Sequence, residues 1–142
     1  MLSLTKIFHF EMAHAIHGYN GACRNIHGHS YELHVKVTAG HDAVGYIPAP
    51  GFILDFKELK LWVNNAVIKR FDHKMVLSSA YRAKHPAIEL HENLVKWEME
   101  PTAENLLIYM AKMLSEQSPY HIQLVRLKLF ETKDSYAEWT NQ

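Results

Sequence analysis

The sequence lacks the features that mark several common protein classes. It has one cysteine, Cys23, which excludes an intrachain disulfide and a cysteine-rich zinc site. Its longest stretch without a charged residue or a histidine covers 12 residues, from 43 to 54, and is too short to cross a bilayer. Lys plus Arg and Asp plus Glu both number 15, so the basic excess that is typical of nucleic-acid-binding proteins is missing.

The composition is otherwise that of an ordinary globular protein. The chain has 142 residues, of which 48% are hydrophobic and 21% charged, and it contains no internal repeat, low-complexity run or flexible linker. These values predict one domain over residues 1–142 that needs no disulfide to fold. The free thiol and the lack of a recognisable signal peptide predict a cytoplasmic protein.

Hydrophobic periodicity predicts four strands and two helices. Residue alternation predicts strands over 4–14, 27–38, 122–130 and 136–140. Two N-cap candidates, Asp55 and Thr102, each precede apolar residues at helical spacing. The first helical stripe comprises Phe56, Leu59, Val63, Ala66 and Val67, and the second comprises Ala103, Leu106, Leu107, Met110 and Leu114. We expect a turn-rich connection over 40–51 and a long irregular segment over 71–101, with partial order over 88–97.

This order of elements predicts an α+β fold. Because strands and helices are segregated along the chain, we expect an antiparallel four-stranded sheet with two helices packed on one face. Such an open sheet has unpaired edges, which small proteins often cover by oligomerisation. We therefore also expect a homo-oligomer.

The unusual number in the composition is 11 histidines, three of which form a candidate metal site. His27 and His29 stand two residues apart on a predicted strand, so both imidazoles project from one face. His14 ends the preceding strand, which can pair antiparallel with this one. Three neutral histidines without a fourth side chain suit a catalytic Zn²⁺, which keeps one position open for water or substrate.

Cys23 lies four residues before His27 in a polar, glycine-containing loop. A thiol close to a cation has a lowered pKa and supplies a thiolate near neutral pH. Three roles are open for it. As a fourth zinc ligand it would make the metal site structural; otherwise it is a general base or an inert thiol.

Asp72, His73 and Glu131 are further candidates for proton transfer or ligand binding. Asp72 and His73 are adjacent after the first helix and can pass a proton if both point into one pocket. Glu131 either ends its strand at the surface or is a buried carboxylate that binds a planar guanidine-like or pterin-like edge through two parallel hydrogen bonds. It continues a predicted apolar row made of Val125, Leu127 and Leu129.

Six short elements occur in the order found in one known family. They are Phe10-Glu11-Met12-Ala13-His14, Cys23-x-x-x-His27-Gly28-His29-Ser30-Tyr31, Ile53-Leu54-Asp55-Phe56, Phe71-Asp72-His73, Pro101-Thr102-Ala103-Glu104-Asn105 and Glu131-Thr132. Together they resemble the family of 6-pyruvoyltetrahydropterin synthase and 6-carboxytetrahydropterin synthase, over residues 8–139.

The resemblance implies a tunnelling fold, in which sheets of several subunits join into a barrel. It implies a hexamer of two trimers, with active sites between subunits. The residues that it assigns to zinc are His14, His27 and His29. Those that it assigns to proton transfer are Cys23, Asp72, His73 and Glu131. Glu131 would also grip the pterin ring, with Thr102 nearby.

The substrate implied by the resemblance is 7,8-dihydroneopterin triphosphate. Three residues separate Cys23 from His27, as in the bacterial queuosine-pathway branch. That branch makes 6-carboxy-5,6,7,8-tetrahydropterin and releases acetaldehyde and triphosphate. Two alternatives are open: a 6-pyruvoyltetrahydropterin synthase that eliminates triphosphate, and a non-catalytic module that binds zinc and a pterin.

One segment departs from the family pattern. Residues 77–100 form a longer stretch than compact members of the carboxy branch have. It carries Tyr81, Arg82, Lys84 and His85, which either line the mouth of the site for the triphosphate or form plain surface.

Overall fold

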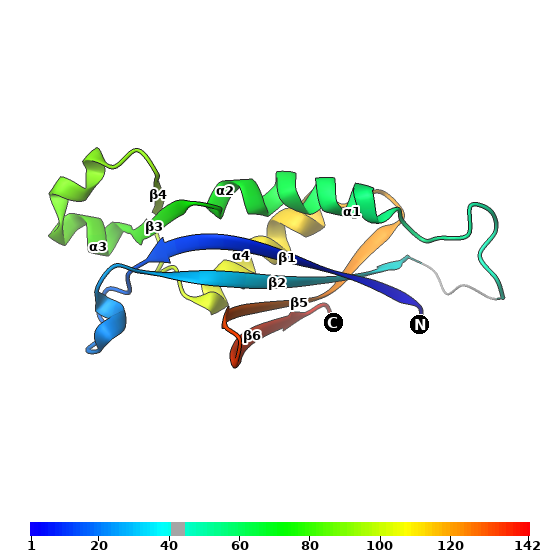
Figure 1. Ribbon diagram of the computed structural model, residues 1–142, viewed down its shortest axis with the longest axis horizontal. Helices are drawn as coiled ribbons and strands as arrows, with labels where there is room; N and C mark the ends of the chain where they lie inside the picture. Colours follow the sequence, from blue (N-terminus) through cyan, green and yellow to red (C-terminus); the bar gives the residue numbers. More distant parts are fainter. Residues whose placement is uncertain (41–44) are drawn as a thin grey trace.

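Two long strands form the centre of a curved sheet, β1 (Ser3–His14) and β2 (His27–Ala39) (Figure 1). The computed structural model describes residues 1–40 and 45–142. The described residues build a six-stranded sheet in the order β4-β3-β1-β2-β5-β6. The strands predicted over 4–14 and 27–38 are confirmed, and their antiparallel pairing runs from Ser3 opposite Thr38 to His14 opposite His27.

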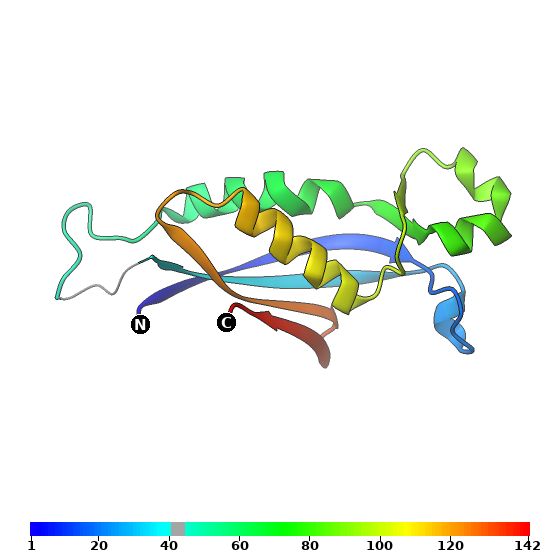
Figure 2. The same cartoon turned by 180° about the vertical axis from the view of Figure 1, so that it is seen from behind.

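Two helical segments cover the same face of this sheet (Figures 1 and 2). The first consists of α1 (Phe56–Val63), a π-helical turn (Asn64–Ile68) and α2 (Lys69–Phe71), which follow one another without a break. The second is α4 (Ala103–Glu116). Both predicted N-caps are present: Asp55 accepts a hydrogen bond from the Lys57 backbone N–H at 2.8 Å, and Thr102 accepts one from that of Asn105 at 3.2 Å.

The core lies between the two helical segments and the sheet. Alternate residues of each central strand point into it, which is the reason for the period of two in their sequences. They are Phe8, Phe10 and Met12 of β1 and Tyr31, Leu33, Val35 and Val37 of β2. The whole predicted stripe of α4 is buried. Phe56, which was predicted in the first stripe, is instead 51% exposed, and Trp62 packs into the core.

The prediction of a four-stranded antiparallel sheet was wrong, because part of the segment expected to be irregular is sheet. β3 (Lys74–Ser78) pairs parallel with β1, and β4 (Leu94–Trp97) pairs parallel with β3. Helix α3 (Ser79–Lys84) and a 3-10 turn (Pro86–Leu90) connect them. Both strands are short and do not alternate, so periodicity could not separate them from a buried loop.

The other side of the sheet is antiparallel, as predicted. β5 (Ile122–Thr132) pairs with β2, and β6 (Ser135–Thr140) pairs with β5. A bulge at Val125 shifts the register, because Lys36 faces Arg126 whereas Val37 faces Leu124. The core row that leads to Glu131 therefore contains Leu127 and Leu129 but not Val125, in contrast to the predicted row.

Two further observations complete the fold. The predicted turn-rich connection over 40–51 includes residues 41–44, which lie outside the described residues. Among the helices that the structure describes, none combines the length and apolar character that crossing a membrane requires. The expected homo-oligomer stays a prediction.

Alanine substitutions on the two faces of α4 should have different effects on the free energy of unfolding. Leu106 is fully buried in the core, whereas Ile108 on the same helix is 63% exposed. We expect Leu106→Ala to lower the free energy of unfolding by about 2–5 kcal/mol through lost burial and the cavity it leaves. Ile108→Ala should change it by less than about 0.5 kcal/mol. Urea unfolding measures both; an equal loss would show that the outer face of α4 is also covered.

Candidate metal centre and active site

Three histidines continue the core rows of β1 and β2 to the end of the sheet. The register places His14 opposite His27 and Met12 opposite His29, so all three imidazoles project from the face that carries the core. Their nearest ring nitrogens lie within 4.8 Å of one another, and this group can hold a metal ion. The predicted triad is thus brought together by strand pairing.

The hydrogen bonds of two of these rings leave one nitrogen of each directed at a common point. His14 Nδ1 donates to the Pro101 carbonyl at 2.6 Å, and His27 Nδ1 donates to the Asn25 carbonyl at 2.8 Å. A carbonyl oxygen only accepts, so each Nδ1 carries the hydrogen and each Nε2 presents a lone pair. These two Nε2 atoms are 3.1 Å apart. A cation between them would relieve the repulsion, and ligands of a tetrahedral zinc stand about 3.3 Å apart.

Burial favours the neutral, metal-binding form of His14 and His29. Desolvation lowers the pKa of His14 to about 4 and also lowers the pKa of His29. Tyr31 lies beneath them with its hydroxyl 3.4 Å from His14 Nδ1, and burial raises the pKa of this phenol, so it stays neutral as well. The donor set therefore fits a divalent metal such as zinc.

The histidines form one wall of a cavity of about 260 Å³, which we call the histidine cavity. Its lining residues are His14, Ile16, Tyr19, Cys23, His27, His29, Thr102, Ala103, Glu104 and Glu131. Cys23, Thr102 and Glu131, which the sequence singled out, are thus at one place. Glu131 is half-buried, and its Oε1 lies 3.9 Å from His14 Nε2, so it does not end its strand at the open surface.

Cys23 lies in a short 3-10 turn (Ala22–Arg24) and is exposed. The Cys23 carbonyl accepts a hydrogen bond from the Ile16 backbone N–H at 2.9 Å, which closes the loop beside the histidines. Within the part of the chain that the structure describes, the group of possible metal ligands contains the three histidines and not this thiol. An exposed thiol beside a metal site is accessible to a ligand in the cavity.

Asp72 and His73 lie elsewhere. His73 lines a different cavity of about 360 Å³, together with Glu11 and Ser30, and His29 of the triad lines both this cavity and the histidine cavity. Asp72 Oδ1 accepts from the Glu11 backbone N–H at 3.0 Å, and the His73 backbone N–H donates to the Glu11 carbonyl at 2.7 Å. The two side chains pair at 2.9 Å, as a proton relay requires. A single chain therefore does not bring them to Cys23.

The backbone of His73 is in the left-handed region, with φ of 60°. A non-glycine residue there is uncommon and is retained only when its surroundings hold it. The hydrogen bonds to both backbone groups of Glu11 hold this one. They direct the imidazole of His73 outward, where 78% of the side chain is exposed.

Sequence reasoning missed three contributors to this site. Pro101 and Asn25 act through their carbonyl groups, which orient His14 and His27. Glu100 anchors the loop, because its Oε1 accepts from the His17 backbone N–H at 2.6 Å. A carbonyl group has no side-chain signature, so only Glu100, directly before the Pro101-Thr102 cap, could have been suspected from the sequence.

Comparison with known proteins agrees with this geometry. Residues 3–142 match the sequence profile of the family described as 6-pyruvoyl tetrahydropterin synthase. The chain belongs to this family. The resemblance stated from its motifs is thereby confirmed.

Relatives of the 6-pyruvoyl tetrahydropterin synthase family are similar over nearly their whole length. A Haemophilus influenzae protein named 6-carboxy-5,6,7,8-tetrahydropterin synthase is 27% identical over 143 residues, which cover 98% of this chain and 99% of that protein. A Rickettsia bellii protein of the same name is 28% identical over 145 residues, with 97% and 99% covered.

Solved structures support the fold of the family. The 6-pyruvoyl tetrahydropterin synthase of Caenorhabditis elegans superposes with a TM-score of 0.69 at 20% identity, covering 99% of this chain and 96% of its own. An uncharacterized protein from Wolinella succinogenes has a TM-score of 0.78 at 18% identity, with 99% and 98% covered. At these identities the likeness shows the shared fold alone.

Removal of one ligand should abolish metal binding at the triad. We expect about one zinc ion per chain in the wild type and loss of that zinc in His27→Ala, because two imidazoles bind it far less tightly than three. His34→Ala is the matched control: His34 lies on the same strand but pairs with Glu32 at 2.7 Å, away from the triad. Elemental analysis of dialysed protein gives the result, and full zinc retention in His27→Ala would contradict the assignment.

Proposed function

We propose that the protein is a zinc-dependent lyase of queuosine biosynthesis. It would convert 7,8-dihydroneopterin triphosphate and one water molecule to 6-carboxy-5,6,7,8-tetrahydropterin, acetaldehyde and triphosphate. The observation that carries the proposal is the histidine cavity, which combines three candidate metal ligands with Cys23 and Glu131. The names of the bacterial relatives that match nearly the whole chain support the choice of product.

Zinc is the metal that best suits the donor set of His14, His27 and His29. Burial lowers the pKa of His14 and of His29, which favours their neutral form, and the two carbonyl contacts leave Nε2 of His14 and of His27 available to a metal. When bound, zinc would polarise the side-chain hydroxyls of the substrate and acidify the neighbouring C–H and O–H bonds.

Cys23 and Glu131 have separate tasks in this proposal. The Cys23 thiolate would take a proton from the substrate side chain, since the thiol is exposed and lines the cavity. The Glu131 carboxylate would accept two hydrogen bonds from N–H groups of the pterin ring. Thr102 caps α4 on the same cavity wall and would lie beside the ring.

A second proton-transfer group would come from a neighbouring subunit. His73, held by Asp72, lies in a different cavity and is largely exposed, so it is free to reach another copy of the chain. In a homohexamer of two trimers with active sites between subunits, this pair would face the substrate opposite Cys23. Two such groups on opposite sides of the side chain permit both isomerisation and cleavage.

Product analysis tests the proposed function. We expect the zinc-loaded protein to convert 7,8-dihydroneopterin triphosphate to 6-carboxy-5,6,7,8-tetrahydropterin, with acetaldehyde trapped as a hydrazone, both identified by mass spectrometry. Formation of 6-pyruvoyltetrahydropterin would assign the protein to the biopterin branch instead. Unchanged substrate that stays bound to the protein would identify a binding module.

Two substitutions should separate proton transfer from ring binding. We expect Cys23→Ala to keep its zinc and its affinity for the substrate while turnover falls about 10²–10⁴-fold. Glu131→Ala should weaken binding of the ring by about 2–5 kcal/mol, because its donors lose their partner. Zinc content should be unchanged in both.

Isothermal titration and steady-state kinetics measure these effects, with Glu116→Ala, an exposed carboxylate at the end of α4, as the control. Loss of zinc from Cys23→Ala would show that Cys23 is a metal ligand and that the metal site is structural. Full activity of Cys23→Ala would show that another group acts as the base, and His73 is the next candidate.

A further inference from the structure

A second cavity adjoins the histidine cavity. It has a volume of about 310 Å³ and lies between the loop 16–25 and helix α3. Ile16 and Tyr19 line both cavities, so the two cavities are direct neighbours. We call it the arginine cavity, after Arg24, which follows Cys23 directly.

The loop wall of the arginine cavity presents a free positive charge. Arg24 is exposed, and in the described part of the chain no carboxylate lies within ion-pair distance of its guanidinium. The backbone around it is ordered by hydrogen bonds, from the Arg24 N–H to the Gly21 carbonyl at 3.1 Å and from the His17 N–H to Glu100 at 2.6 Å. The Arg24 side chain therefore extends from an ordered backbone at the cavity.

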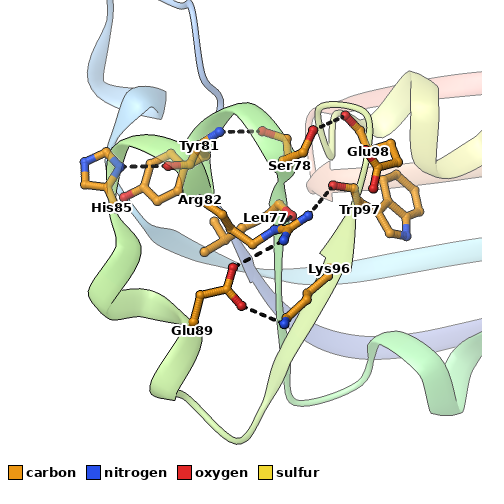
Figure 3. A network of polar contacts seen from close by, with 10 residues as sticks. Leu77, Ser78, Tyr81, Arg82, His85, Glu89, Lys96, Trp97 and Glu98 are labelled. Atoms are coloured by element: carbon orange, nitrogen blue, oxygen red, sulfur yellow. Dashed lines mark hydrogen bonds and ion pairs between the residues drawn. The ribbon is translucent and has the colours of Figure 1, made fainter.

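The opposite wall is formed by Tyr81 of α3 and by His85, which directly follows that helix. His85 Nδ1 donates to the Tyr81 carbonyl at 3.0 Å, and its ring stacks on the buried Tyr81 ring with centroids 4.2 Å apart. These contacts fix the imidazole and leave its other nitrogen directed away from the helix (Figure 3). When protonated there, the ring is a cationic hydrogen-bond donor.

Arg82 holds this wall in place and is not available to a ligand (Figure 3). Its guanidinium pairs with Glu89 at 3.3 Å and donates to the carbonyls of Trp97 at 3.1 Å and Leu77 at 3.4 Å. Glu89 also pairs with Lys96 at 2.6 Å. Of the two arginines near the cavity, one is thus occupied within the fold and the other faces the cavity.

We propose that the arginine cavity binds the polyphosphate group of a ligand whose ring lies in the histidine cavity. The Arg24 guanidinium binds phosphate oxygens from the loop wall, and His85 binds them from the wall of α3. The planar guanidinium matches phosphate in geometry and is always charged. Among the described lining residues none carries a carboxylate, so nothing at the cavity surface repels an anion. That this ligand is 7,8-dihydroneopterin triphosphate rests on the proposed function.

Inorganic tripolyphosphate is the probe for this site. In calorimetric titrations of the full-length protein, we expect Arg24→Gln to weaken tripolyphosphate binding about 10- to 100-fold, as loss of hydrogen bonds to a charged group does. His85→Gln should weaken it about 2- to 10-fold. The titrations are repeated in the His27→Ala background, where chelation of the bound metal cannot contribute.

Lys84→Gln is the matched control, because it removes one positive charge from exposed α3 at a residue that does not line the cavity. It should change the affinity less than about twofold, since an exposed charge that does not line the cavity is screened by salt. Equal weakening of tripolyphosphate binding by Lys84→Gln and Arg24→Gln would show that affinity depends on net charge alone, and would overturn the proposal. Unchanged affinity in Arg24→Gln would also overturn it.

Kinetics separate a failure of this proposal from a failure of the proposed function. If the enzyme forms product, Arg24→Gln should raise KM for 7,8-dihydroneopterin triphosphate by the same factor as it weakens tripolyphosphate binding. Product formation with unchanged KM and affinity would overturn the polyphosphate site alone. Tripolyphosphate binding that depends on Arg24 in a protein that forms no product would overturn the proposed function alone.

Discussion

The antiparallel register of β1 and β2 sets the geometry of the metal-binding group. It places His14 opposite His27 and Met12 opposite His29, and a slip of one residue would turn His27 and His29 to the other face of the sheet. The same register buries Phe10 against Tyr31, with the rings stacked 4.9 Å apart. Burial of these apolar residues opposes any slip. The positions of the polar ligands thus follow from packing further along the same strands.

Hydrogen bonds from two loops orient the histidine rings that the strand register brings together. The carbonyls of Pro101 and Asn25 fix which nitrogen of His14 and of His27 carries the hydrogen, so each ring presents Nε2 before any metal arrives. Pro101 can do this because α4 begins directly after it, and the Thr102 cap fixes that helix end. Helix capping, which stabilises the fold, therefore also orients a ligand.

Polar groups of different function are kept apart by the layers of the fold. The three candidate metal ligands, the Cys23 thiol and Glu131 line one cavity, Arg24 lines a neighbouring cavity, and His73 lines a third, which shares His29 with the first. The left-handed backbone of His73 is held by hydrogen bonds to Glu11 rather than by any contact with the histidines. This separation is the structural reason to consider a site completed by a second chain.

The sequence alone determined what depends on local periodicity and spacing. It located the central strands, both N-caps, the buried stripe of α4 and the three histidines on one strand face, because each follows from residues close in the chain. Tertiary structure alone decided the parallel pairing of β3 and β4, the bulge that removes Val125 from the row of Glu131, and the placement of His73 and Cys23 in different cavities. It also decided that Arg82 pairs with Glu89 and the Trp97 carbonyl, whereas Arg24 has no ion-pair partner among the described residues and lines a cavity. These outcomes depend on contacts between residues far apart in the chain, often with backbone carbonyls, and such contacts leave no pattern in the amino-acid order.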